Sequence, residues 1–299
     1  MGYGQTYNYG SQLYKGMALP TIATGFFRIA TNDLSAYVDI PLPNYPYKST
    51  IKLAFDIQEL DNGDLYIRDE GNTYDKRYCD IDLILTPTQQ YNLNQQINYT
   101  NRAQTFVLIL PSTQCGFFPF GPDLGNVGPF QIICTYPETP KINYAPFKYF
   151  TCKLQFALVG APPPFTLPTQ IDDGPLSVAG IGTVNLPPDL FEPDQEYAYD
   201  VQLTENSTPQ FINRGTLGDC VKSEFTLLCN YSKSAAIVNA LAVTYRATGL
   251  PLIAPSPTYA LGVDQGASGT YTLNNISDTL EITNEDYNRF SMKVSLHQV

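Results

Sequence analysis

The chain has 299 residues, a length typical of two domains of about 150 residues each. Hydrophobic residues make up 43% of the chain and charged residues only 15%, and the 24 Pro, 21 Gly, 22 Tyr and 16 Phe favour strands and turns over long helices. The net charge of −11, without a cluster of Lys and Arg, argues against direct binding of nucleic acid.

Residues 1–20 are predicted to be a flexible N-terminal arm. They are polar and rich in Gly, with Lys15 as their one charge, and their contact residues are expected to be aromatic: Tyr3, Tyr7, Tyr9 and Tyr14. We expect the arm to order only against a neighbour or an underlying membrane. It has no charged and apolar regions of the kind found in signal peptides, and the chain has no apolar run of about 20 residues, so cytosolic synthesis is expected.

Residues 21–160 are predicted to form a first barrel. Its β runs alternate apolar and polar residues and are separated by turn clusters such as DNGD and PETP. About eight runs are expected, at 25–31, 36–42, 51–58, 64–68, 78–85, 105–111, 129–135 and 149–159. A Pro-rich linker, 161–175, leads to a second barrel, 176–299, and short helices are predicted at 89–97 and 232–242.

The second barrel is predicted because the chain repeats itself. Shifted by 144 residues, segment 39–113 aligns without a gap with 183–257, and 16 of these 75 positions are identical. LAFDIQ (53–58) aligns with YAYDVQ, and Gly71 and Asp75 recur in the following loop as Gly215 and Asp219. The closing segment YFTCKLQFAL (149–158) aligns with 289–298 at a shift of 140. The sequence therefore indicates the duplication of one domain.

Two charged pairs recur in both copies, Asp56 with Asp200 and Arg102 with Arg246. A residue that serves the fold should recur with the fold, whereas a residue of a single active site should not. We therefore expect each of these four residues to anchor a loop or strand end through hydrogen bonds.

The side chains available for catalysis are few. The only histidine, His297, lies near the C-terminus and lacks an evident partner, so triad chemistry is not expected. Acidic pairs such as Asp80 and Asp82 resemble glycosidase carboxylates, but their alternation with Ile81 and Leu83 predicts the outer face of a strand. The six cysteines fit no zinc spacing and are expected to be reduced, with one or more disulfides as the alternative. We predict no catalytic residue.

No cofactor is predicted except a possible structural calcium ion. The loop at 61–72 resembles a calcium loop in composition but departs from the EF-hand order. Its weak candidate ligands are Asp61, Asp64 and Asp69, and two of these positions become Thr208 and Asn213 in the second copy. A calcium site would therefore belong to the first copy alone.

These features predict an all-β protein made of two tandem eight-stranded antiparallel jelly-roll barrels with short helices in loops, because a repeat near 140 residues is longer than an immunoglobulin-like domain. A duplicated barrel of this size resembles the double jelly-roll major capsid proteins of membrane-containing icosahedral bacteriophages, the lineage that includes the adenovirus hexon. The resemblance rests on architecture over residues 21–299, not on a diagnostic motif.

The resemblance implies a structural capsid protein of the virion, synthesised in the host cytoplasm, whose homotrimers form pseudo-hexagonal capsomers in an icosahedral shell. Its implied partners are itself, neighbouring capsomers, minor capsid, penton and spike proteins, and an internal viral membrane through the arm. The alternatives are a phage spike or receptor-binding protein and a tandem β-sandwich carbohydrate-active module. Copy number in the virion separates the first from a capsid protein, and glycan binding would reveal the second.

Overall fold

The computed structural model describes 18 segments of the chain: residues 20–59, 65–71, 75–100, 105–111, 115–126, 128–135, 141–143, 149–160, 163–174, 176–178, 180–184, 194–196, 199–203, 209–213, 220–246, 250–254, 269–275 and 277–298. Strands predominate among these residues, and their pairings are antiparallel. The prediction of a mostly β, antiparallel protein is therefore confirmed, and the described strands include a large antiparallel sheet.

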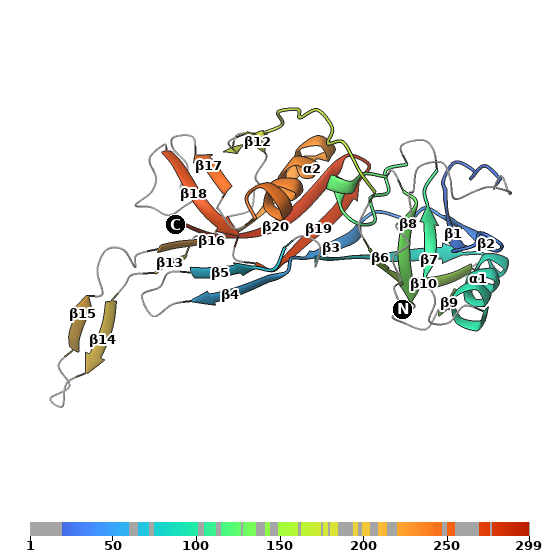
Figure 1. Cartoon of the computed structure of the whole chain (residues 1–299), viewed down its shortest axis with the longest axis horizontal. Coiled ribbons are helices and arrows are strands. Elements are labelled where there is room, and N and C mark those ends of the chain that lie inside the picture. Colours follow the sequence, from blue (N-terminus) through green and yellow to red (C-terminus); the bar gives the residue numbers. More distant parts are fainter. Residues whose placement is uncertain are drawn as a thin grey trace, which may run out of the picture. The chain divides into compact units, whose positions relative to one another are not determined.

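The described residues of the first copy form ten strands, a short α-helix and a π-helix, and Figure 1 shows their course. Their bounds are β1 (Phe26–Thr31), β2 (Tyr37–Pro41), β3 (Tyr47–Lys52), β4 (Phe55–Glu59), β5 (Leu65–Asp69), β6 (Lys76–Leu85), α1 (Pro87–Asn94), η2 (Gln95–Thr100), β7 (Phe106–Ile109), the 3-10 turn η3 (Pro122–Leu124), β8 (Phe130–Thr135), β9 (Lys141–Asn143) and β10 (Tyr149–Leu158).

The second copy repeats this series (Figure 1). Its elements are β11 (Leu176–Val178), β12 (Gly182–Val184), β13 (Asp194–Glu196), β14 (Tyr199–Leu203), β15 (Pro209–Asn213), β16 (Cys220–Asn230), α2 (Tyr231–Asn239), η5 (Ala240–Thr244), β17 (Leu250–Ala254), β18 (Gly269–Asn275), β19 (Thr279–Asp286) and β20 (Arg289–Gln298). The predicted helices at 89–97 and 232–242 are confirmed as α1 and α2 with the π-helices that follow them.

A set of strand pairings recurs in both copies. In the first, β1 pairs with β2 and β7, β7 with β8, and β10 with β8, β6 and β9. In the second, β11 pairs with β12 and β17, β17 with β18, and β20 with β18, β16 and β19. The register repeats as well, because Asp82 lies opposite Lys153 and the equivalent Thr226 lies opposite Lys293.

Contacts divide the chain into two compact units, and the division does not follow a single cut in the linker. The first unit comprises residues 1–49, 77–120 and 124–166, and the second comprises 50–76, 121–123 and 167–299. The β4–β5 hairpin of the first copy thus belongs to the unit built around the second copy. The contiguous domains of 21–160 and 176–299 stay a prediction; residues 50–76 are grouped with the second unit, in which Asp69 and Asp75 bind Arg246 and Leu53 binds Asp278.

The core of the first unit lies between strands whose burial alternates. In β6 the buried positions are every second residue, so Ile81 and Leu83 point inward while Asp80 and Asp82 are exposed. Asp80 and Asp82 therefore lie on the outer face, as predicted. Aromatic rings fill much of the interior, with Phe27, Phe106, Phe117, Phe120, Phe130 and Phe156 all nearly inaccessible to solvent.

One predicted strand is broken in two. The run at 51–58 reads as a continuous strand, but β3 ends at Lys52 and β4 begins at Phe55. Between them Leu53 donates its amide to the carbonyl of Asp278 at 2.6 Å, and Phe55 donates to the carbonyl of Leu53 at 2.9 Å. The strand is interrupted here because these backbone groups form hydrogen bonds outside the β-sheet. The alternation of apolar and polar residues in the sequence does not reveal such bonds.

Candidate assembly site

Arg246 lies at the end of a π-helix in the second copy. In η5 the amide of Tyr245 donates to the carbonyl of Ala240 at 2.7 Å, a bond across five residues. Such wide turns are rare within helices and often mark functional sites. The first copy has the same arrangement, with η2 directly after α1. In the sequence of each copy an arginine, Arg102 or Arg246, follows the last residue of the π-helix by two positions.

The Arg246 clasp consists of Arg246 with Asp69, Asp75 and Phe55. The guanidinium binds Asp75 with two parallel hydrogen bonds of 2.7 and 2.8 Å, and its Nε donates to Asp69 Oδ1 at 2.6 Å. It lies over the ring of Phe55, 4.6 Å from the centroid, and Nη1 also donates to the carbonyl of Ala242 at 3.0 Å. This geometry uses the planar fork of arginine, which a lysine ammonium does not reproduce.

Burial makes the clasp sensitive to the loss of either partner. The side chains of Arg246 and Asp75 are each only 7% exposed, and that of Asp69 is 28% exposed. Burial by itself would raise the pKa of Asp69, but hydrogen bonds from Arg246 and from the Gly71 amide outweigh it and leave this pKa lowered. The charged form of the carboxylate is therefore the one that the folded chain stabilises.

The clasp holds the β4–β5 hairpin at its base. Asp75 Oδ1 accepts a hydrogen bond of 2.8 Å from the amide of Ala54, and the amide of Glu70 donates to the carbonyl of Ala54 at 3.0 Å. Within the hairpin Phe55 lies opposite Asp69, so these two contacts of the guanidinium come from paired positions of β4 and β5. Asp75 thus closes the hairpin and binds Arg246 with one carboxylate.

The other predicted anchoring residues are placed differently. Asp56 is an exposed residue of β4 whose Oδ2 accepts a 3.3 Å hydrogen bond from Gln58 in the same strand. The side chain of Asp200 and the whole of Arg102 lie outside the described residues. The anchoring role of these three residues stays a prediction.

Of the predicted calcium ligands, Asp69 is engaged by Arg246, while Asp61 and Asp64 lie outside the described residues. Within the described segments no three His, Cys, Asp or Glu residues are grouped closely enough to hold a metal ion.

The arm tyrosines, Tyr3, Tyr7, Tyr9 and Tyr14, also lie outside the described part. Pro20, the last residue of the predicted arm, is described, and its carbonyl accepts a 2.8 Å hydrogen bond from the buried Arg28. Arg28 also binds Asp39 through two hydrogen bonds of 2.6 and 2.8 Å.

A second cluster of charges fixes the end of the linker to the start of α2. Lys233 is 1% exposed and donates to Asp172 Oδ1 at 2.9 Å and to the carbonyl of Ile181. Asp173 accepts a 2.8 Å hydrogen bond from the amide of Asn230. The hydrogen bond from Lys233 is the main reason that the pKa of Asp172 is lowered, whereas burial raises that of Asp173. These contacts stabilise the fold, because each of these charged groups has a hydrogen-bonding partner.

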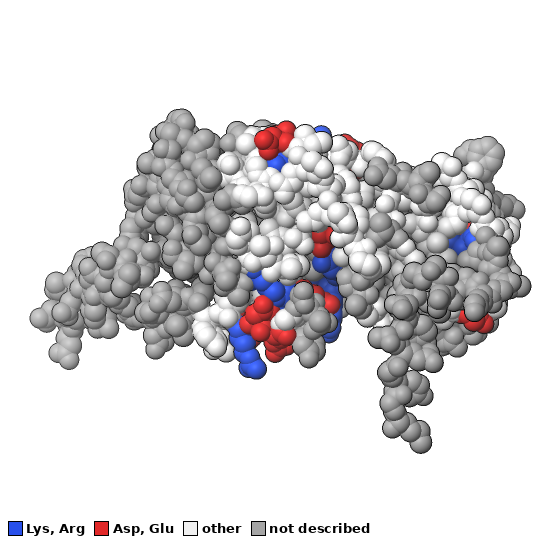
Figure 2. All heavy atoms as spheres, turned by 45° about the horizontal axis from the view of Figure 1, so that its top comes forward, with Lys and Arg blue, Asp and Glu red and all other residues white. Residues whose placement is uncertain are grey.

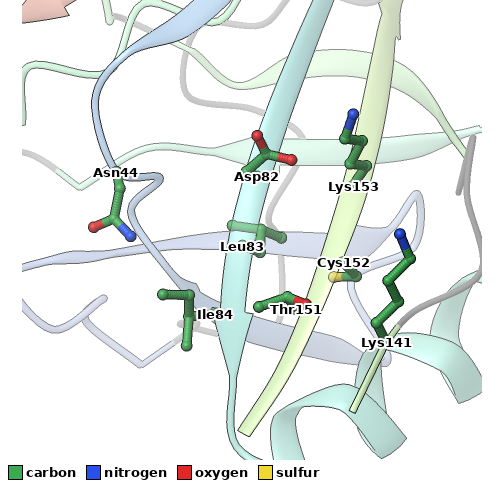
Figure 3. Close-up of a pocket in the computed structure, with 8 residues that line it drawn as sticks. All are labelled: Asn44, Asp82, Leu83, Ile84, Lys141, Thr151, Cys152 and Lys153. Carbon is green, nitrogen blue, oxygen red and sulfur yellow. The ribbon is translucent and has the colours of Figure 1, made fainter. Parts of the chain in front are cut away.

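A shallow pocket of about 300 Å³ lies on the outer face of the first unit (Figure 3). Its charged lining residues, Asp82, Lys141 and Lys153, come from the neighbouring strands β6, β9 and β10. Cys152 also lines it, but burial first, and then the charge of Asp82, raises the pKa of this thiol to about 11. A thiol with this pKa is almost entirely protonated at neutral pH and is a poor nucleophile.

A smaller pocket of about 160 Å³ lies along β19 and β20 in the second copy. It contains Lys293, which corresponds to Lys153 in the repeat. The two pockets share this lysine position, but the first is lined mainly by β6 and β10, whereas the described lining of the second comes from Ser277, β19 and β20.

The described cysteines are free thiols, four of them buried and Cys115 half-buried. On the face shown in Figure 2, the described acidic and basic side chains lie next to one another, and no extended basic patch is seen. None of the described helices combines the length and the apolar character needed to cross a bilayer.

Comparison with known proteins finds no matching protein-family model and no significantly similar curated sequence.

Sequence reasoning identified Arg246 but missed its partners. The signal was present, because Asp75 recurs as Asp219 and Phe55 is aromatic in both copies, as Tyr199 in the second. No local pattern indicates that Arg246, in the second copy, binds two carboxylates of the first copy. Asp75 is 171 residues away from it in sequence and Asp69 is 177 residues away.

Proposed function

We propose that this chain is a structural major capsid protein whose two copies are jelly-roll barrels and whose trimers tile an icosahedral viral shell. The observation that carries the proposal is the repetition of one strand order and register in both halves of the chain. Three such chains supply six similar units, and a threefold particle with six similar units has a nearly hexagonal outline that packs in flat arrays.

The chemistry of the described residues supports a structural role. The charged groups with the most complete hydrogen bonding, Arg28, Lys233 and Arg246, are each buried and paired within the fold. Interfaces between copies would use the abundant Tyr and Phe, and neighbouring capsomers, minor capsid, penton and spike proteins are the proposed partners. The N-terminal arm is the segment proposed to meet an internal membrane.

The test is to express the full chain and determine its mass by light scattering, followed by electron microscopy of the particles. A trimer with a hexagonal outline is expected, together with the same chain as the most abundant protein band of its virion. A persistent monomer at high concentration would contradict the proposal. A minor band in the virion would indicate a spike protein instead, and binding on a glycan array would indicate a carbohydrate module.

A further inference from the structure

The pocket on the outer face of the first unit is built on paired strands (Figure 3). Two of these strands, β6 and β10, are paired so that Ile84 lies opposite Thr151. On the other side of β10, Lys141 of β9 also lies opposite Thr151. Side chains that rise from hydrogen-bonded strands are held in fixed relative positions, as a binding site requires. The volume of about 300 Å³ is at the lower end of the range for small-molecule sites.

Two lysines line this pocket from neighbouring strands. Lys153 lies two residues beyond Thr151 on β10, so it is the diagonal neighbour of Lys141 on β9. Diagonal neighbours on antiparallel strands are about 7–8 Å apart, a distance over which two long side chains can reach the same small ligand. In Figure 3 both lysine side chains extend in the same direction along their strands. The two ammonium groups can therefore donate to one bound anion.

Other polar groups of the pocket add hydrogen-bonding capacity. Asn44 and Thr151 line it with an amide and a hydroxyl, both of which can donate. Asp82 lies directly opposite Lys153, a position in which opposite charges attract one another. The described lining thus holds two ammonium groups and one carboxylate, which favours an anionic ligand over a cationic one.

An apolar side chain forms a further part of the pocket. Ile84 alternates with the buried Leu83 and Leu85 of β6, so it lies on the outer face of the strand. It is 50% exposed, and in Figure 3 it lies away from both ammonium groups. A ligand that contacts the lysines and also covers Ile84 has an anionic group attached to an apolar body.

We propose that this pocket binds a small organic acid, with its carboxylate held by Lys141 and Lys153 and its apolar body against Ile84. Ammonium and carboxylate groups form charge-assisted hydrogen bonds, and covering Ile84 removes apolar surface from water. Because the lysines are exposed, the dissociation constant is expected to be about 1 mM. One chain forms the site, so the inference goes beyond the proposed function and does not rest on it.

The first test is an NMR titration of the full chain with cyclohexanecarboxylate. Lys141→Ala and Lys153→Ala should each raise the dissociation constant by about tenfold, because each removes one charged donor. The matched control is Lys293→Ala, which removes the corresponding lysine of the second copy and should leave the dissociation constant unchanged. Circular dichroism checks that each variant is folded. Failure of the wild type to bind, or unchanged binding by both variants of the pocket lysines, would overturn the inference.

The second test varies the ligand. Acetate should bind about tenfold more weakly than cyclohexanecarboxylate, because it lacks the apolar body. The neutral analogue cyclohexanecarboxamide should not bind detectably. Ile84→Asn should remove the advantage of cyclohexanecarboxylate over acetate and leave the binding of acetate unchanged. If inorganic phosphate binds as tightly as cyclohexanecarboxylate, the assignment to an organic acid is wrong.

A third measurement distinguishes a free acid from an acidic side chain of another copy of the chain. The dissociation constant for cyclohexanecarboxylate should be the same over a dilution series of the protein, because one chain forms the site. A value that rises with protein concentration would mean that a second copy occupies the pocket, which contradicts the inference. A chain that stays monomeric and binds the acid would remove the capsid proposal and support this one.

Discussion

At the scale of single residues, buried cations are paired through specific geometry. Arg28, Lys233 and Arg246 are between 1% and 7% exposed, and each has a carboxylate within hydrogen-bonding distance. A buried charge is costly unless it is paired, so these contacts are places where one substitution should have a large effect. Recurrence in both copies does not by itself identify such a residue. Asp56 has an equivalent in the other copy and is exposed, whereas Arg246 has one and is buried.

The Arg246 clasp gives the first prediction on stability. Arg246→Ala should lower the free energy of unfolding of the second unit by about 3–5 kcal/mol, because Asp75 is left buried without its cation. Arg246→Lys should recover only part of this loss, since an ammonium does not form the two parallel bonds. Urea unfolding followed by circular dichroism measures the change. An Arg246→Ala protein as stable as the wild type would show that the clasp contributes nothing.

The buried thiols give a prediction on pH. Burial raises the pKa of Cys152 to about 11 and that of Cys229 to about 12, from an ordinary value of 9.0. Below pH 9 both thiols keep their protons whether or not the chain is folded, so their contribution is constant. Above pH 9 the unfolded chain releases protons that the folded chain retains, so the free energy of unfolding should fall, by up to ~1.4 kcal/mol per pH unit for each thiol.

Unfolding in urea at a series of pH values from neutral to alkaline checks this sign. A variant with Cys152→Ala and Cys229→Ala should lose stability less steeply above pH 9 than the wild type does. Equal slopes in the two proteins would mean that the thiols are not the groups responsible.

At the scale of elements, both helices begin with a capped turn. Thr86 accepts a hydrogen bond from the amide of Gln89, whose side chain in turn binds the Thr86 amide, and Pro87 occupies the first helical position. Asn230 caps α2 in the equivalent place by accepting from the amide of Lys233 at 3.0 Å. The two copies thus keep the capping function while changing the residue that performs it.

These caps are predicted to differ in importance. Thr86→Ala should cost about 1 kcal/mol of stability, the usual value for a lost N-cap. Asn230→Ala should cost more, because the Asn230 side chain also accepts a hydrogen bond from Ser232 in the segment that holds the linker. Thermal unfolding of both variants measures the difference, with Asn230→Ser as the conservative control. Equal losses for the two alanine variants would show that the linker contacts do not depend on the cap.

At the scale of the whole molecule, duplication produced copies that are alike in strand order and unlike in their contacts. One hairpin belongs to the unit built around the other copy, and its partner hairpin carries the same closing carboxylate in sequence. The likeness in strand order and register, which supplies two similar units per chain, is the basis on which we propose assembly.

The repeat and most of the local structure can be predicted from the sequence alone. Alternating burial placed Asp80 and Asp82 on the outer face, and the shifts of 144 and 140 residues aligned α1 with α2 and β10 with β20, because side-chain periodicity and repetition are both written along the chain. The interruption of the strand at Leu53 and the binding of Asp75 to Arg246 become visible only in the folded chain. Those contacts join residues far apart in sequence, and such contacts leave no periodic pattern, since they depend on where packing brings the chain.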